Sequence, residues 1–347
     1  MQVDYIIVGL GLAGIAFAET LERNNKSFVV FDSSASNASK VAGGMYNPII
    51  LKRLSLVYDA RSQMETALPF YRQLEKNLKI KIDYPLDIYK IFQSVSDQNN
   101  WFTACSHPLK SEYLMSKIIP NKNPAIKASF GFGQLTGAGR IAARELISSY
   151  KKYLHDKNLL RVEQLNYADL KIENTHCTYT NIISKKVVFC EGHAGVDNPF
   201  FTWVPLKRNK GELITIYAPH LQCKHILKAG VFVIPLGNDI YNVGATYNRE
   251  ETFPHPTVSA KTKLEEKLKK MIQVPYEIIN HKAGIRPVVR DRRPILGTHP
   301  EYNSLVLLNG MGSRGVMSAP KMANLLFKNL EEGIALPKEL DIRRFVS

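Results

Sequence analysis

The hydrophobic pattern is most regular at the start of the chain. An apolar run over Asp4–Val8 has the length of a buried strand, and a second run follows at Ser27–Phe31. Between them, apolar positions recur at helical spacing after the glycine-rich turn Gly9–Gly14. This order predicts a strand–turn–helix–strand unit, which Asp32 closes at the end of the second strand.

The turn has the spacing G-x-G-x-x-G, which is typical of dinucleotide binding when a strand precedes it and a helix follows. Gly9 permits the tight turn, Gly11 lets the backbone approach a pyrophosphate, and Gly14 lets helix and strand pack closely. The helix start stabilises phosphate charge, and the Asp32 carboxylate can accept hydrogen bonds from a ribose. The alternative is an ordinary turn of this type without a ligand.

The pattern changes after this unit. Small residues dominate Ser33–Ser39, and Gly43–Gly44 follows, so this stretch either lets the backbone pass close to a flat ligand or forms a flexible surface loop. We expect an amphipathic helix at 57–78, and short strands and loops over 80–135.

The second half of the chain returns to strands and helices. We expect a helix at 139–155 and a buried strand at Lys185–Cys190, which ends at Glu191-Gly192. An antiparallel pattern over 203–250 is followed by a helix at 258–272.

The end of the chain repeats the strand–glycine–helix pattern. The strand is Ser304–Leu308, the turn Asn309–Gly315 and the helix Ser318–Glu332. Such a helix start suits the electron-rich edge of a ring system. We therefore predict one nucleotide-binding domain built from residues 1–78, 136–202 and 281–347, and a strand-rich substrate or cap domain built from residues 79–135 and 203–280.

Composition adds one unusual property. A hydrophobic content of 45% and a charged content of 22% describe an ordinary globular protein. No apolar run is long enough to span a bilayer and no signal peptide is evident, so we expect a cytoplasmic protein with no membrane partner. The cysteines and histidines lack metal-ligand spacing, so we expect no metal site. The net charge of +15 favours a polyanionic partner, unless it reflects a lysine-rich proteome.

Four blocks resemble the D-amino acid oxidase/glycine oxidase superfamily of flavoproteins over nearly the whole chain. The blocks are Gly9–Gly14 with Asp32, Ser39–Pro48, Val187–Gly192, and Ala283–Gly297 with Asn309–Pro320. The resemblance implies an α/β fold (α+β overall). It consists of a Rossmann-type FAD-binding domain of glutathione-reductase type, assembled from discontinuous segments, with an inserted antiparallel-sheet substrate domain that covers the flavin.

The resemblance also implies the site. Arg286 would bind a substrate carboxylate, and the alternative is that it forms an ion pair with Asp291. Tyr241 and Tyr247 would shape the substrate pocket or serve only in packing. With no cysteine between 281 and 299, we expect FAD to be bound non-covalently. The expected FAD contacts are Gly9, Gly11, Leu12, Ala13, Gly14, Asp32, Ser33, Ser39, Ala42, Gly43, Gly44, Met45, Val162, Glu191, Gly192, Gly310, Gly312, Ser313, Arg314, Gly315 and Val316.

Part of the sequence is similar to the oxidase module of the bifunctional tRNA 5-methylaminomethyl-2-thiouridine biosynthesis enzymes. The similar stretches are Gly44–Pro48, Arg290-Asp291 and Met311–Pro320. That module oxidises an N-substituted glycine on a tRNA uridine, which would give the positive charge a meaning. This sequence lacks the accompanying methyltransferase module. It also departs from the free-glycine oxidases, whose second arginine would fall near Ser313, whereas Arg314 is the basic residue here. We expect phosphate contacts, unless internal ion pairs form instead, at Lys207, Arg208, Lys210, Lys282, Arg286, Arg290, Arg292 and Arg293.

Three functions follow as hypotheses. The first is an FAD-dependent oxidase or dehydrogenase that removes hydride from the carbon beside an amine nitrogen of a glycine-like or N-substituted glycine substrate. The second is an FAD enzyme acting on carboxymethylaminomethyl uridine in tRNA. The third is a non-catalytic flavin- or nucleic-acid-binding protein.

Overall fold

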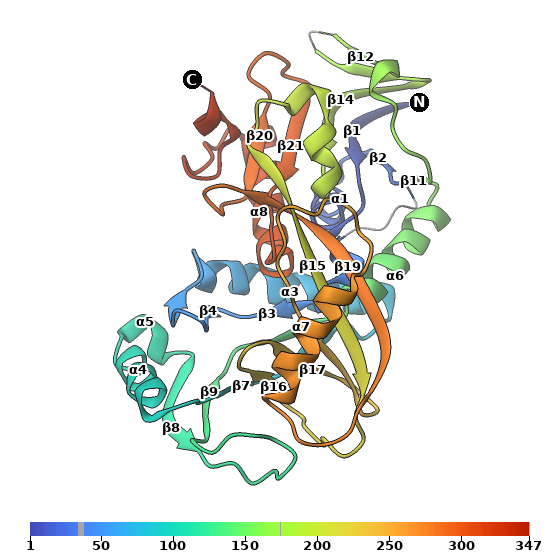
Figure 1. The fold of residues 1–347 in the computed structure, drawn as a ribbon. Helices are drawn as coiled ribbons and strands as arrows, with labels where there is room; N and C mark the ends of the chain where they lie inside the picture. Colours follow the sequence, from blue (N-terminus) through green and yellow to red (C-terminus); the bar gives the residue numbers. More distant parts are fainter. Residues whose placement is uncertain (34–37, 174, 347) are drawn as a thin grey trace.

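A parallel sheet carries the N-terminal glycine turn at the end of its strand β1. The computed structural model describes residues 1–33, 38–173 and 175–346. Neighbouring strands in this sheet are β11 (Leu160–Arg161), β2 (Phe28–Phe31), β1 (Gln2–Val8), β14 (Ile182–Phe189), β21 (Leu305–Asn309) and β20 (Ile295–Thr298). Only β20 of these runs antiparallel to its neighbour, and the antiparallel strands β13 (Cys177–Tyr179) and β12 (Leu170–Ile172) join beside the start of β14. The sheet is therefore assembled from segments far apart in sequence, as predicted (Figure 1).

Both faces of the parallel sheet are covered, so its strands alternate between two hydrophobic clusters. Ile7, Val30 and Val188 pack on one face with the helices α1 (Leu12–Arg23), α3 (Ala60–Leu78), α6 (Ala143–Asp156) and α8 (Gly315–Glu332). Ile6 and Val29 point to the other face, which is covered by η1 (Tyr167–Asp169), η3 (Pro199–Phe201) and η4 (Ile342–Phe345).

A second sheet, which we call the cap sheet, lies below the first in Figure 1. Its strands in order are β19 (Glu277–Val289), β15 (Leu206–Tyr217), β18 (Ile240–Gly244), β17 (Phe232–Gly237), β16 (Ile226–Lys228), β7 (Ile88–Ile91), β9 (Phe132–Leu135) and β8 (Leu114–Ile119). All neighbours are antiparallel except β16 and β7. Helix α7 (Val258–Lys269) packs on one face, and the other faces the nucleotide-binding elements.

Short elements join the two sheets. They are α2 (Ala38–Val41), the small sheet of β3 (Met45–Tyr46), β10 (Gly139–Ile141) and β6 (Asp83–Pro85), and the pair β4 (Ile49–Ile50) and β5 (Ser55–Leu56). No helix in the described part of the chain is both long and apolar enough to cross a bilayer.

Several predicted elements differ at their ends. Helix α8 begins at Gly315, whereas the sequence predicted Ser318, and the helix expected at 139–155 begins only at Ala143 because β10 precedes it. The stretch 80–135 was predicted to hold only strands and loops, which is wrong. It contains α4 (Val95–Cys105) and α5 (Pro108–Ser111). The proposed domain boundary at 280/281 falls inside β19.

Candidate functional site

The first glycine turn leaves no room for side chains at two of its glycines. Gly9 has a φ of +95°, and a β-carbon there would lie 2.7 Å from the Cys190 carbonyl oxygen. A β-carbon at Gly14 would lie 2.0 Å from the Gly9 carbonyl oxygen, so only glycine lets α1 start this close to the turn. At Gly11 the nearest atom is Ser39 Oγ at 3.5 Å, which leaves the backbone open to a ligand.

Asp32 lies beside this turn at the end of β2. Its side chain is buried, and Oδ1 accepts a hydrogen bond from the Leu10 N–H at 2.8 Å. Oδ2 forms an ion pair with Lys151 of α6, a partner that the sequence did not predict. The Asp32 N–H donates to Arg161, so the expected contacts Ser33 and Val162 also lie at this end of the sheet. Residues 34–37 of the predicted small-residue stretch lie outside the described residues.

The second glycine turn meets the first. Gly310 and Gly312 have positive φ angles, and Arg314 is the N-cap residue of α8. A β-carbon at Gly315 would lie 3.4 Å from Leu12 in the first turn. The second turn therefore lies against the first, which brings the starts of helices α1 and α8 side by side, with Ala13, Ser313 and Val316 at these starts.

The end of β14 lies against the first glycine turn. Gly192 has a φ of +59°, and a β-carbon there would meet no atom within 4 Å. The Glu191 carboxylate accepts hydrogen bonds from the Tyr167 hydroxyl and from Asn198 Nδ2, the latter at 2.8 Å. Burial raises the pKa of Glu191, and these two donors oppose the rise. Its carboxylate is thus a structural group, while its backbone lies against Gly9.

The segment after α2 lies between the first turn and the cap sheet. Ser39 Oγ accepts a hydrogen bond from the Leu12 N–H at 3.5 Å. Gly44 has a φ of +69°, and a β-carbon there would lie 1.9 Å from the Ile141 carbonyl oxygen. A β-carbon at Gly43 would lie 2.8 Å from Ile234 of β17. The expected contacts Ala42 and Met45 flank this glycine pair, so the segment lies where the cap sheet approaches the first glycine turn.

Arg286 lies on the face of the cap sheet that approaches this segment. On the same face, a β-carbon at Gly284 would lie 3.1 Å from Val41. The backbone carbonyl oxygen of the neighbouring Pro287 accepts a hydrogen bond from the Gly312 N–H at 2.9 Å, so β19 also contacts the second glycine turn. The guanidinium donates weakly to the Thr246 carbonyl oxygen at 3.4 Å.

The surroundings of Arg286 leave its charge without a carboxylate. Burial lowers the pKa of Arg286, and no ion pair involves it within the described residues. The alternative pair with Asp291 does not form, because Asp291 binds Arg344 at 2.9 Å. The guanidinium lies directly over Gly211, where a β-carbon would be 2.1 Å from it. Sequence reasoning missed Gly211, although a glycine within a strand indicates a close approach.

The two predicted tyrosines lie in different places. Tyr247 is 67% exposed, and its ring centroid is 4.6 Å from the Arg286 guanidinium carbon. Tyr241 is buried in the core beside α7, and its hydroxyl accepts a hydrogen bond from the Cys223 N–H at 3.2 Å. Strand alternation puts Tyr241 on the opposite face of the cap sheet from Arg286, so the structure does not bring these two residues together.

Positive charge continues from Arg286 toward the surface. Burial lowers the pKa of Arg314, and the nearby positive charge of Arg292 adds to this effect. Arg290 and Arg292 are exposed. Other members of the predicted phosphate-contact group have internal partners: Lys210 binds Glu212 at 3.1 Å, Arg208 pairs with Asp197, and Arg293 lies over the Tyr58 ring.

This arrangement fits a flavin dinucleotide. Open backbone at Gly11, Gly192 and Gly312 and two adjacent helix starts suit a pyrophosphate and an electron-rich ring edge. Asp32 ends the second strand of the first βαβ unit. In dinucleotide-binding folds, an acidic residue at this place binds the adenosine ribose. The fold and the two glycine turns together define a dinucleotide-binding protein.

Comparison with known families agrees with this class. The chain matches the model of the FAD dependent oxidoreductase (DAO) family over residues 4–328, and it belongs to that family. The predicted fold class and superfamily are confirmed.

Individual relatives are distant. The tRNA 5-methylaminomethyl-2-thiouridine biosynthesis bifunctional protein MnmC of Marinobacter nauticus is 20% identical over 92% of this chain, which spans 54% of that protein's length. Glycine oxidase of Geobacillus kaustophilus is 23% identical over 95% of this chain and 93% of its own.

Solved structures share the fold. That glycine oxidase has a TM-score of 0.82 at 19% identity, covering 99% of this chain and 98% of its own. Iminodiacetate oxidase of Chelativorans sp. BNC1 has a TM-score of 0.79 at 16% identity, covering 96% and 97%.

Proposed function

We propose that this FAD-dependent oxidoreductase oxidises an amine that carries a carboxylate on the reacting carbon, as in glycine or an N-substituted glycine. Arg286 carries the proposal, since its mostly buried guanidinium has no carboxylate partner within the described residues. A buried cation without a partner is costly, and a substrate carboxylate would satisfy it through paired hydrogen bonds.

The residues around Arg286 have distinct roles in this proposal. Arg286 binds and orients the carboxylate, while Tyr247 covers the guanidinium from the solvent side. Thr215 and Asn242, which bond to each other at 2.9 Å, lie on the same face of the cap sheet and offer polar groups to the amine. FAD, bound non-covalently, supplies the hydride acceptor for the carbon beside the amine nitrogen.

A second candidate is a modified RNA as substrate, with carboxymethylaminomethyl uridine in tRNA as the specific case. It is favoured by the net charge of +15 and by exposed Arg290 and Arg292 next to Arg314. A small amine needs no such exposed charge, whereas RNA phosphates do. Charge reversal of Arg292 to Glu should weaken RNA binding about tenfold and leave turnover of a free amine nearly unchanged. Unchanged RNA affinity in a binding titration would remove this placement.

Anaerobic bleaching of the flavin absorbance at about 450 nm tests these proposals. Glycine, sarcosine and D-amino acids are compared with glycinamide, which keeps the amine but lacks the carboxylate charge. Bleaching by the carboxylates and not by glycinamide supports the first proposal, and bleaching only by the modified tRNA supports the second. A flavin that no amine or RNA bleaches would leave the third hypothesis, a non-catalytic protein.

A further inference from the structure

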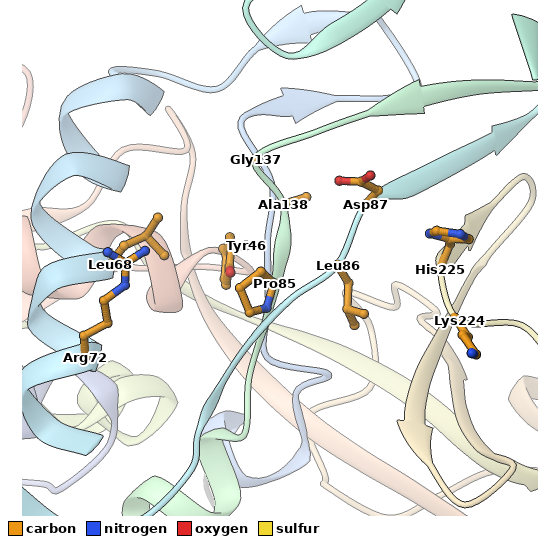
Figure 2. A pocket seen from close by; sticks show the side chains of 10 residues that line it. All are labelled: Tyr46, Leu68, Arg72, Pro85, Leu86, Asp87, Gly137, Ala138, Lys224 and His225. Atoms are coloured by element: carbon orange, nitrogen blue, oxygen red, sulfur yellow. The ribbon is translucent and has the colours of Figure 1, made fainter. Parts of the chain in front are cut away.

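A cavity of about 450 Å³ opens between α3 and the cap sheet (Figure 2). None of its lining residues belongs to the two glycine-rich turns or to the surroundings of Arg286. They are Tyr46, Leu68, Arg72, Pro85, Leu86, Asp87, Gly137, Ala138, Lys224 and His225. The volume is within the range of small-molecule sites, so the cavity can hold one nucleotide-sized group.

The cavity has a flat aromatic wall. The His225 ring stacks on the Tyr89 ring, with centroids 4.0 Å apart and planes 8° apart. Tyr89 does not line the cavity, whereas His225 does, so the stacked pair presents its imidazole to the cavity. Burial lowers the pKa of His225, which favours the neutral ring at neutral pH. Such a ring is a stacking platform for a base.

Cationic side chains lie at opposite sides of the cavity. Figure 2 shows Arg72 on α3 at one side and Lys224 beside His225 at the other, with Tyr46 and Pro85 between them. Both cations are exposed, and neither has a carboxylate within 4.0 Å in the part of the chain that the structure describes. Asp87 lies between them and accepts a hydrogen bond from Gln134 Nε2 at 2.7 Å.

We propose that this cavity binds one nucleotide of a single-stranded RNA segment. The base stacks on His225, its amino group donates to Asp87, and the two flanking phosphates contact Arg72 and Lys224. The inference rests on the second candidate function, the RNA substrate. An acidic peptide would also meet the two cations, but its carboxylates carry no base to stack on the His225–Tyr89 pair.

The test is a fluorescence-anisotropy titration of the flavin-loaded protein with an unmodified RNA stem-loop. Arg72→Ala and Lys224→Ala should each weaken binding about 3–10-fold and reduce the slope of log affinity against log salt by about 0.7. His225→Ala should weaken binding about tenfold or more without changing that slope. His225→Phe should bind RNA about as tightly as the wild type, because a stacking ring is present again. Lys171→Ala, on β12 at the far end of the molecule, is the matched control.

The design separates this subsite from the reaction itself. Unmodified RNA cannot be turned over, so its binding does not depend on the identity of the amine substrate. Competition by a free nucleoside monophosphate, with the same loss in His225→Ala, would show that a single nucleotide is enough to fill the subsite. Wild-type affinity and wild-type salt slope in Arg72→Ala, Lys224→Ala and His225→Ala would overturn the proposal.

Discussion

Replacing Arg286 by Met should leave the stability of the protein unchanged or slightly higher, while it weakens substrate binding strongly. In the protein without substrate, the substitution removes a 3.4 Å hydrogen bond to Thr246 and a contact with the Tyr247 ring. Together these interactions contribute about 1–2 kcal/mol to stability. It also removes a mostly buried charge without a counterion, whose desolvation costs several kcal/mol. The net effect on the free energy of unfolding is therefore close to zero, or a gain of about 1 kcal/mol.

Substrate binding should change much more. Loss of the paired, charge-assisted hydrogen bonds to a carboxylate costs about 2–4 kcal/mol, which raises KM by roughly 30- to 1,000-fold. Arg344→Met is the matched control, because Arg344 is half-buried, pairs with the exposed Asp291 at 2.9 Å and donates to the Pro294 carbonyl oxygen at 3.0 Å. That control should lose about 1–2 kcal/mol of stability and keep its KM.

Two measurements on the flavin-loaded protein check this pair of effects. Denaturant unfolding gives the change in stability, and steady-state kinetics with an amine that bleaches the flavin gives KM. If Arg286→Met lost more than about 3 kcal/mol and kept its KM, Arg286 would be a structural residue and the proposal would be refuted.

Other expectations concern a partly buried lysine of the cap sheet and the packing of the first glycine turn. Lys228 donates to the Ala229 carbonyl oxygen at 2.6 Å, and burial lowers its pKa to about 8 from 10.5. The charged form of Lys228 thus destabilises the folded state below pH 8, so the free energy of unfolding should rise between pH 8 and 10.5. Lys228→Met should be about 2 kcal/mol more stable than the wild type at neutral pH. Denaturant unfolding of this variant should show no such rise with pH. Gly14→Ala should lose several kcal/mol of stability in thermal unfolding and should lose FAD, because the new β-carbon would meet the Gly9 carbonyl oxygen. Gly230→Ala is the control and should be tolerated, because only the flexible Lys267 side chain lies nearby. Equal melting temperatures for these two variants would contradict the packing at Gly14.

The two glycine-rich turns could be predicted because their parts are local in sequence. Each glycine turn sits between a strand and a helix that adjoin it, so spacing alone indicates the geometry at Gly9, Gly14 and Gly310. Even the missed helix α4 had a local signal, since the Ser94 hydroxyl accepts a hydrogen bond from the Asp97 N–H at its start.

The substrate side could not be predicted in the same way, because strand register decides it. A shift of one residue moves a side chain to the other face of a sheet, so the sequence did not show that Tyr241 points away from Arg286. The pairs Lys151–Asp32 and Arg344–Asp291 join elements distant in sequence, and no local pattern marks them.

The central claim is that both glycine-rich turns close over a single FAD. The most direct measurement is the absorption spectrum of the purified protein, followed by acid precipitation and quantification of the released flavin. We expect a band at about 450 nm and one FAD per chain, all of it in the supernatant. A colourless protein that takes up no added FAD would contradict the account.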